Sequence, residues 1–329
     1  MIGVAIVGLG SRGRHVIRML ERQSQLQLVC GVDVDPDRGA NTAARIPVTD
    51  RLDVVLANPA VQAVILATPH SLHEEQVTRA ARAGKHVFCE KPLGMSRESA
   101  LRSVNACSTA KVVLGVGHER RFEPPVLELR RMIARADLGT LLQVEANFSH
   151  DEMVGSDKQS WWRSPSEAPA AGMTGPGIHL LDLCVSILGE ADRVVAHSET
   201  LATEMPAGDA MAALLRFKSG ATAYISTILA TPFVSRFQVF GSRGWVEIRD
   251  GKRDEPHQGW AMTTCLAGGH PEVREYPAAD AALMNLKAFA NAVEGLVPYP
   301  IQHSDMVNSV AAMEAIFVSA AGGGTVVAV

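Results

Sequence analysis

Three closely spaced glycines form the first pattern in this chain that could carry chemistry. They give G-x-G-x-x-G between an apolar run and a helical pattern. Glycine at these positions allows a tight turn, a close approach of the backbone to a pyrophosphate, and contact between helix and strand. Free amides at the helix start then face the phosphates. The residues of this loop that we expect at the cofactor are Gly8, Gly10, Ser11, Arg12 and Gly13.

An acidic residue follows at a spacing typical of dinucleotide-binding units. Asp33 ends the second apolar run, 20 residues after Gly13. A carboxylate there accepts hydrogen bonds from the ribose hydroxyls of adenosine and repels a 2′-phosphate. Arg12 and Arg38 lie near enough in sequence to offset part of that repulsion. The predicted cofactor is therefore NAD, with NADP less favoured. The alternative interpretation is a plain strand–helix turn followed by a solvated aspartate.

A polar segment follows another apolar run, where ligands of open parallel sheets bind. The residues predicted there to contact the ribose or pyrophosphate are Thr68, Pro69, His70 and His73. A purely structural interpretation is compatible with this one. The Thr68-Pro69 pair turns the chain, and Ser71 with Glu74 forms a capping-box pattern for the next helix.

The segment Glu90-Lys91-Pro92 also comes directly after a buried run, so we expect Glu90 and Lys91 at the cofactor. Apolar neighbours on both sides would partly desolvate the lysine, which lowers its pKa toward acid–base use. The alternative is a surface ion pair of Lys91 with Glu90 or Glu98.

A histidine and an aspartate stand three residues apart in a helical pattern. His179 and Asp182 therefore share one face, and an imidazole beside a carboxylate is a common arrangement for proton transfer. The alternative is a histidine satisfied by its own helix turn. Other chemistries lack their patterns, because the sequence has no H-x-x-x-H, H-E-x-x-H, cysteine cluster or G-x-S-x-G. We predict no metal site.

Trp161, Trp162 and Arg163 precede the His179 segment in a loop. Their indole faces and guanidinium group suit the substrate side of a site, and we place Trp162 and Arg163 there. Core packing of at least one tryptophan is the alternative.

Most of these groups lie in the first 120 residues. This part of the chain repeats one pattern, in which an apolar run is followed by a turn and then by a segment with helical periodicity. The runs predicted as strands are residues 4–7, 26–32, 61–67, 86–89 and 111–116, with a short element at 54–56. This pattern predicts a parallel sheet with crossover helices.

Beyond residue 120 the pattern changes to extended runs with hairpin-like connections at 218–220 and 241–244. The predicted strands are residues 141–149, 193–198, 210–217, 221–229, 236–240 and 245–248. The predicted helices are residues 125–136, 281–294 and 306–320, the last with Ser304 as N-cap. We therefore predict an α/β Rossmann-type domain at 1–120, followed at 121–329 by an α+β domain with an open, mostly antiparallel sheet.

Composition excludes several classes. The 329 residues are 47% apolar and 20% charged with a net charge of −4, an ordinary globular balance without the basic surplus that nucleic acid requires. No apolar run of membrane-spanning length and no signal-peptide pattern occur. The five scattered cysteines have no C-x-x-C pair and indicate reduced thiols, hence a cytoplasmic protein.

The motifs together resemble the Gfo/Idh/MocA oxidoreductases, of the glucose–fructose oxidoreductase and inositol dehydrogenase type. The matching segments are residues 8–13, 68–69, 83–93, 117–122 and 177–182, in order through nearly the whole chain. The run A-G-K-H-V-F-C-E-K-P at 83–92 is the most specific of them.

The resemblance implies an NAD(P)-dependent enzyme that transfers a hydride between nicotinamide and a hydroxyl or carbonyl carbon of a sugar, polyol or cyclic diol. It implies that Lys91 lies beside the nicotinamide and the substrate hydroxyl and that His179 acts as acid and base, with Asp182 a candidate orienter. Arg121 is placed on the substrate side. The second domain of such proteins buries an apolar sheet face against another subunit, so residues 224–229 indicate a homodimer or homotetramer.

Two positions depart from the family pattern. Gly175 stands where many members have an aspartate four residues before the histidine, and Glu119 stands where an asparagine is frequent. Two alternatives from other classes stay open: an NAD-requiring glycoside hydrolase and a non-catalytic protein that senses NAD(H).

Overall fold

A computed structural model describes residues 1–39, 46–152, 154–155, 161–251 and 258–329 of the chain. They form two compact units, the first of Met1–His118 with Ala282–Val307 and the second of Glu119–Ala281 with Asn308–Val329. The predicted division after residue 120 lies close to the first of these breaks. The return of segment 282–307 to the first unit was not predicted.

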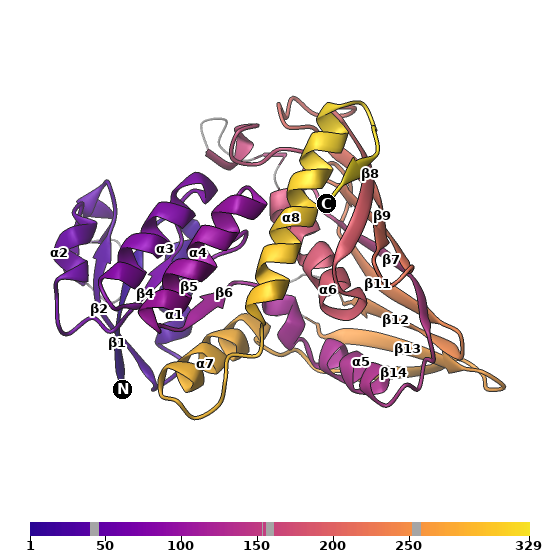
Figure 1. Cartoon of the computed structure of the whole chain (residues 1–329), viewed down its shortest axis with the longest axis horizontal. Coiled ribbons are helices and arrows are strands. Elements are labelled where there is room, and N and C mark those ends of the chain that lie inside the picture. Colours follow the sequence, from indigo (N-terminus) through magenta and orange to yellow (C-terminus); the bar gives the residue numbers. More distant parts are fainter. Residues whose placement is uncertain (40–45, 153, 156–160, 252–257) are drawn as a thin grey trace. The chain divides into compact units, whose positions relative to one another are not determined.

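Six parallel strands form the sheet of the first unit (Figure 1). They are β1 (Ile2–Val7), β2 (Leu26–Val32), β3 (Val48–Thr49), β4 (Ala63–Leu66), β5 (His86–Cys89) and β6 (Leu114–Val116). Their order is β3-β2-β1-β4-β5-β6. Strand β1 is buried at every position, as a central strand covered on both faces must be. The strand order reverses between β1 and β4, the place where open α/β sheets bind ligands.

Helices of the first unit cover this sheet. They are α1 (Ser11–Leu20), α2 (Leu52–Leu56), α3 (His73–Arg82), α4 (Arg97–Ala110), α7 (Ala281–Val293) and the start of α8 (His303–Ala321). Helices α3 and α4 pack side by side (Figure 1). In α7, the Phe289 ring lies 5.5 Å from that of Phe88 in β5. Leu286 and Phe289 belong to the same apolar core as β1, which explains why this late segment joins the first unit.

The short element predicted at 54–56 is part of the helix α2, in which Leu52, Val55 and Leu56 are buried at helical spacing. One local prediction in this unit was wrong. The helix after Thr68 begins at His73 without a side-chain cap, preceded by the 3₁₀ turn η2 (His70–Leu72). Glu74 does not complete a capping box, since its carboxylate is bound by Arg102 of α4.

Nine strands form the sheet of the second unit, in the order β14-β13-β12-β11-β7-β10-β9-β8-β15. They are β7 (Leu141–Ser149), β8 (Ala191–Glu199), β9 (Ala210–Phe217), β10 (Thr222–Ile228), β11 (Val234–Gly241), β12 (Gly244–Asp250), β13 (Trp260–Leu266), β14 (Glu272–Tyr276) and β15 (Val327–Ala328). The β7–β10 pair is parallel and the other pairs are antiparallel. The mostly antiparallel sheet is thus confirmed, and both predicted hairpins form. Strands β13 to β15 were not predicted.

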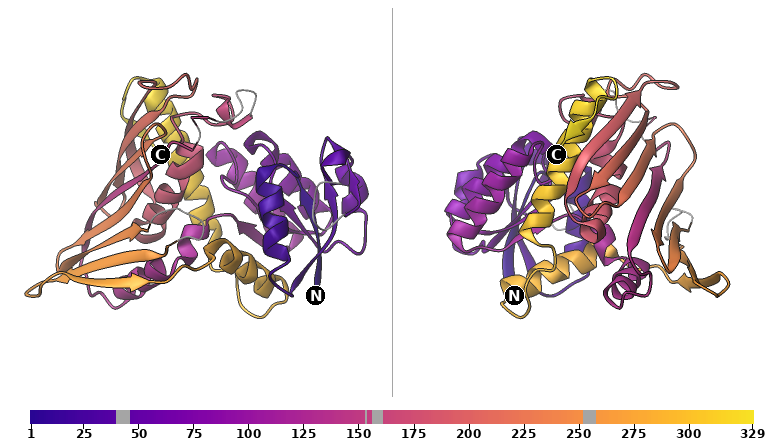
Figure 2. Two further views of the ribbon diagram at one scale, coloured as in Figure 1. Left: turned by 180° about the vertical axis from the view of Figure 1, so that it is seen from behind. Right: turned by 45° about the vertical axis from the view of Figure 1, so that its right-hand side comes forward.

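Helical segments pack on one face of this sheet (Figure 2). They are η3 (Glu119–Phe122), α5 (Pro124–Ala134), the π-helical turn η5 (Met173–Gly177), α6 (Ile178–Leu188) and the rest of α8, while the short η4 (Trp161–Arg163) lies in the connection between β7 and η5. Because α8 begins at His303, Ser304 lies inside the helix and is not its N-cap.

The opposite sheet face carries none of the helices among the described residues (Figure 2). Leu214 and Tyr224, neighbours in the β9–β10 ladder, are 50% and 43% exposed on it. In the part of the chain that the structure describes, no helix is both long enough and apolar enough to span a bilayer.

Candidate active site

The glycine-rich loop joins β1 to α1 at the carboxyl edge of the parallel sheet. Gly8 has φ +90°, and a β-carbon there would lie 2.6 Å from the carbonyl oxygen of Ala67. A β-carbon at Gly13 would overlap the carbonyl oxygen of Gly8, so α1 approaches the strand closely only because residue 13 is glycine. Gly10 is the N-cap of α1 and has no atom within 4 Å of the corresponding point. The start of α1 therefore leaves open space where a pyrophosphate can approach the helix amides.

Asp33 is fixed against this loop. Its carboxylate is buried and accepts hydrogen bonds from the backbone N–H of Leu9 at 2.7 Å and of Asp35 at 3.0 Å. The Nη1 atom of Arg38 lies 3.5 Å from Asp33 Oδ1. An oriented carboxylate beside the loop suits a ribose diol, while the adjacent guanidinium offsets part of its charge.

The Glu90-Lys91-Pro92 segment follows β5 and is joined to the same loop. Arg12 Nε lies 2.7 Å from Glu90 Oε1, an ion pair whose glutamate side chain is only 7% exposed. Glu90 Oε2 accepts the backbone N–H of Lys91 at 3.3 Å. A β-carbon at Gly117 would stand 2.7 Å from Glu90 Oε2, so the glycine after β6 makes room for this carboxylate. Lys91 itself is half-buried.

The segment after β4 supports the lysine loop from the other side. The His73 ring is fully buried, with Nδ1 2.7 Å from the carbonyl oxygen of Pro92 and Nε2 3.1 Å from that of Thr68. The buried ring of His73 connects these two loops, and its cofactor contact stays a prediction. The Thr68 hydroxyl donates to Gln76 Oε1 at 2.6 Å. His70 is buried with its ring edge-on to His73, and Pro69 is half-buried. Cofactor contacts of Thr68, Pro69 and His70 stay predictions.

In the second unit, helix α6 carries His179 in its first turn and Asp182 one turn later. Both Asp182 oxygens accept hydrogen bonds from Arg121, from Nε and from Nη2, each at 2.7 Å. The Ser309 hydroxyl donates to Asp182 Oδ1 at 3.1 Å. The side chains of Arg121 and Asp182 are 1% and 2% exposed, so the pair anchors η3 to α6 inside the unit. The substrate contact of Arg121 and the action of Asp182 on His179 stay predictions.

A second carboxylate faces His179. Glu119 Oε1 lies 3.8 Å from His179 Nε2, and the two side chains are 24% and 9% exposed. This is ion-pair distance and exceeds that of a hydrogen bond.

A buried charged cluster follows Glu119 along the chain. Arg120 Nη2 lies 2.8 Å from Asp250 Oδ2 and donates to the Ser235 hydroxyl at 3.2 Å, and its guanidinium stacks over the Phe148 ring at 4.2 Å. Glu123 Oε1 lies 3.8 Å from Arg120 Nε. Burial raises the pKa of Glu123 to about 8, against the attraction of Arg120.

The remaining predicted residues of the second unit are Trp162 and Arg163 in η4. Trp162 is half-buried and Arg163 is 8% exposed, and their place on the substrate side stays a prediction. Among the described residues, no group of three or more histidine, cysteine, aspartate or glutamate side chains is arranged to hold a metal ion.

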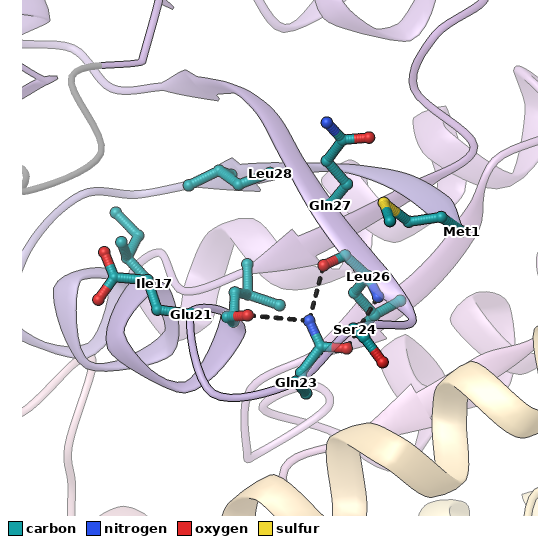
Figure 3. A pocket seen from close by; sticks show the side chains of 9 residues that line it. Met1, Ile17, Glu21, Gln23, Ser24, Leu26, Gln27 and Leu28 are labelled. Atoms are coloured by element: carbon teal, nitrogen blue, oxygen red, sulfur yellow. Dashed lines mark hydrogen bonds between the residues drawn. The ribbon is translucent and has the colours of Figure 1, made fainter.

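A pocket of about 320 Å³ lies at the other end of β2 and α1 from these groups (Figure 3). Its lining includes Ile17, Leu20 and Leu26, and the Gln23 amide donates to the carbonyls of Leu20 and Leu26. Because it opens at the first residues of β2, it lies roughly 20 Å along the strand from Asp33. It takes no part in the cofactor site.

Comparison with known proteins identifies both halves of the chain. Residues 2–118 match the oxidoreductase family with an NAD-binding Rossmann fold, GFO_IDH_MocA, and residues 126–247 match the GFO/IDH/MocA C-terminal domain. The chain belongs to the GFO/IDH/MocA oxidoreductase family.

Several curated proteins are similar to this chain. A 1,5-anhydro-D-fructose reductase of Ensifer adhaerens is 28% identical, over 88% of this chain and 87% of that protein. A D-xylose 1-dehydrogenase (NADP(+)) of Haloferax volcanii is 27% identical, over 83% and 82%. A 2,7-anhydro-N-acetylneuraminate hydratase of Escherichia coli K12 is 32% identical over 59% of this chain, and the match spans about half, 52%, of that relative.

Solved structures of other proteins have the same fold as this chain. GenD2 from gentamicin A biosynthesis, in complex with NAD, superposes with a TM-score of 0.83 at 27% identity over 100% of this chain and 96% of that one. An oxidoreductase from Desulfitobacterium hafniense reaches a TM-score of 0.88 at 23% identity, over 99% and 97%.

The first unit of this GFO/IDH/MocA member fits a nicotinamide dinucleotide. The open N-terminus of α1 at Gly10 suits the pyrophosphate, and the oriented carboxylate of Asp33 suits the adenosine ribose. The Arg12–Glu90 pair then places the lysine loop beside the glycine loop. No sequence signal indicated Gln76, which accepts a hydrogen bond from the Thr68 hydroxyl. Gly117 lies in the family-like segment 117–122, but its role of making room for Glu90 was not predicted.

Proposed function

We propose that this GFO/IDH/MocA protein is an NAD(H)-dependent dehydrogenase or reductase that acts on a hydroxyl or carbonyl carbon of a sugar, polyol or cyclic diol. The observation that carries the proposal is the 2.7 Å ion pair between Arg12 and Glu90. It joins the glycine-rich loop to the loop that carries Lys91, which supports a place for this lysine at the cofactor site. The reductase and dehydrogenase relatives support a sugar or polyol substrate.

The cofactor, when bound, supplies the acceptor or donor of the hydride. Gly8, Gly10 and Gly13 would hold its pyrophosphate against α1, with Ser11 and Arg12 at the helix start. Asp33 would bind the adenosine ribose and favours NAD over NADP. Arg38, 3.5 Å from Asp33, is the residue that would meet a 2′-phosphate.

In this proposal, Lys91 and His179 have different roles toward the substrate. The Lys91 ammonium holds the reacting oxygen and stabilises the negative charge that develops on it. His179 takes the hydroxyl proton during oxidation and returns it during reduction. Asp182 and Arg121 support this residue by fixing α6 and η3 to one another. Trp162 and Arg163 line the substrate side.

A redox-neutral activity is the second candidate, and the hydratase relative at 32% identity favours it. In such a reaction a hydride would leave the substrate and return to it, so no reduced cofactor would accumulate. An NAD-requiring glycoside hydrolase belongs to the same class.

One screen distinguishes these activities. Aldoses, cyclic polyols, anhydro sugars and glycosides are incubated with the enzyme and NAD⁺ or NADH, while the absorbance of reduced nicotinamide and the sugar products are both followed. We expect at least one polyol or sugar to change the absorbance in proportion to its conversion. Conversion without an absorbance change would favour the redox-neutral candidate. Cofactor binding without any conversion would favour an NAD(H)-sensing protein.

We also propose a cytoplasmic homodimer or homotetramer. All five cysteines are free thiols and four are buried, which suits a reducing compartment. The helix-free sheet face with Leu214 and Tyr224 supplies an apolar surface for a second copy.

A further inference from the structure

We propose that Glu119 is a positioning residue for His179, whose carboxylate holds the imidazole and stabilises its protonated form. The inference rests on the proposed function, because it takes His179 to be the proton carrier. Both residues belong to the second unit: Glu119 opens η3, and His179 lies in the first turn of α6. Glu119 Oε1 is 3.8 Å from His179 Nε2.

His179 occupies a place where a positive charge needs support. Its side chain is 9% exposed, and burial disfavours the charged imidazolium. A carboxylate at ion-pair distance has the opposite effect. A proton carrier at this position therefore depends on an anionic neighbour, and Glu119 supplies one.

The other charges around α6 have different partners. Helix α6 packs against η3, η5, β7 and β10, and Ser309 of α8 donates a hydrogen bond to its Asp182. The turn η5 carries no titratable side chain. The titratable groups on the other elements, besides Glu119, are Arg120 bound to Asp250, Arg121 bound to Asp182, Glu145 bound to Arg236, the exposed Tyr224, and Glu314 in the part of α8 that belongs to this unit. Arg120 and Glu123 also interact electrostatically with Glu119. Within this set, the carboxylate at ion-pair distance from His179 is that of Glu119.

Glu119 influences proton transfer both in substrate oxidation and in substrate reduction. During oxidation the substrate carbon would lose its hydride to NAD⁺, giving NADH, and the hydroxyl proton would pass to the imidazole, which then carries a positive charge beside the carboxylate. During reduction the protonated ring returns this proton to the new alkoxide oxygen. Glu119 forms no bond with the substrate and changes only how readily His179 holds the proton.

The direct test is the pKa of His179 in the full-length protein with NAD⁺ bound. Histidine is labelled with ¹⁵N, the ring signals are followed by NMR over about pH 5 to 8, and H179N assigns the resonance. In E119Q, which keeps the shape and removes the charge, we expect the pKa of His179 to fall by about one unit. The matched control E190Q removes a carboxylate that binds Lys218 beyond the far end of α6, and it should leave this pKa unchanged.

Kinetics supply a second readout once a substrate is known. The acidic limb of the kcat profile for oxidation should move to lower pH by the same amount in E119Q, with little change in KM. A shift of the NMR pKa below about 0.3 units would overturn the inference, since variation of that size is ordinary between environments. The NMR result does not need turnover, so a missing substrate activity would count against the proposed function alone.

A third measurement serves if E119Q does not fold. In the wild-type protein with ¹³C-labelled glutamate, the Glu119 carboxyl resonance, assigned with E119D, should show a second inflection at the pKa of His179, because coupled groups report one another's titration. A single inflection in the ordinary carboxylate range would overturn the inference.

Discussion

The Nε atom of Arg12 lies 2.7 Å from Oε1 of Glu90, although the two residues are 78 positions apart in the sequence. This contact joins the glycine-rich loop after β1 to the Glu90-Lys91-Pro92 loop after β5. The same glutamate accepts the backbone N–H of Lys91 through its other oxygen. Through Glu90, the Arg12 side chain of the glycine-rich loop thereby fixes the backbone of Lys91. In our proposal, the Lys91 ammonium holds the reacting oxygen of the substrate.

Breaking this pair should weaken cofactor binding. In E90Q the charge is lost while the shape is kept, so we expect the Kd for NAD⁺ to rise roughly two- to fivefold, as for a partly exposed ion pair. The measurement is isothermal titration of full-length protein with NAD⁺. The control E75Q removes a surface partner of Arg79 on α3 and should not change Kd. Equal Kd values for wild type and E90Q would show that the pair does not organise the site.

Cofactor preference follows from Asp33 and Arg38. We expect NAD⁺ to bind several-fold tighter than NADP⁺, because the buried Asp33 carboxylate repels a 2′-phosphate. In R38A the affinity for NADP⁺ should fall further while that for NAD⁺ changes little, since only the phosphate needs this guanidinium. Quenching of the intrinsic fluorescence of the four tryptophans measures both affinities. Equal binding of the two cofactors to the wild type would contradict this account.

The local motifs made the first unit predictable. Its parallel strands read as apolar runs because both faces are covered, and the stripe of Val16, Ile17 and Leu20 in α1 follows the helical period. Strand β14 could not be found this way, because it is exposed at every position but Tyr276 and has no alternating pattern.

The features that could not be predicted from the sequence depend on contacts between residues that are distant in the chain. Segment 282–307 joins the first unit through Phe289 and its neighbours, and no local pattern tells which sheet a late helix covers. The candidate site shows the same limit. The helical spacing predicts that His179 and Asp182 interact. In the structure, Asp182 instead binds Arg121, which lies 61 positions earlier. The carboxylate at ion-pair distance from His179 is that of Glu119.

Assembly is testable on the helix-free sheet face. We expect the wild-type protein to be a dimer or tetramer at micromolar concentration, and L214E to shift it toward monomer, because a buried charge opposes association. Leu101 on α4, 39% exposed, provides the control L101E, which should not dissociate the protein. Light scattering coupled to size exclusion decides, with circular dichroism as the check on folding. A monomeric wild type would refute the proposed assembly.

Glu123 gives a pH dependence of stability with a definite sign. Burial raises its pKa to about 8 from the usual 4.5, so the folded protein holds a proton that the unfolded chain releases in this interval. Stability from this group is therefore present at low pH and falls as pH rises from about 4.5 to about 8. E123Q cannot ionise, so its Tm relative to wild type should rise steadily between these pH values.

Scanning calorimetry of both proteins across this interval measures the difference. The control E128Q removes a carboxylate that pairs with Arg131 near the surface of α5 and should give no rising difference in the same window. Parallel Tm curves for wild type and E123Q would show that Glu123 titrates in its ordinary range.

The central claim is that Lys91 acts on the reacting oxygen, and the K91M variant tests it most directly. Loss of a charge that stabilises a transition-state oxyanion costs about 3–4 kcal/mol, or roughly 10²–10³ in rate. The glycine loop and Asp33, which hold the other end of the cofactor, are untouched by the change. The matched control K287M removes an exposed lysine of α7 and should keep full activity.

The measurement is single-turnover hydride transfer by wild type, K91M and K287M, each saturated with NAD⁺ and with the substrate that the screen identifies, alongside titration of NAD⁺ binding. The account predicts that K91M loses roughly 10²-fold or more of the rate and binds NAD⁺ nearly as the wild type does. Retention of more than about a tenth of the wild-type rate by K91M would contradict it, because Lys91 would then be a structural residue.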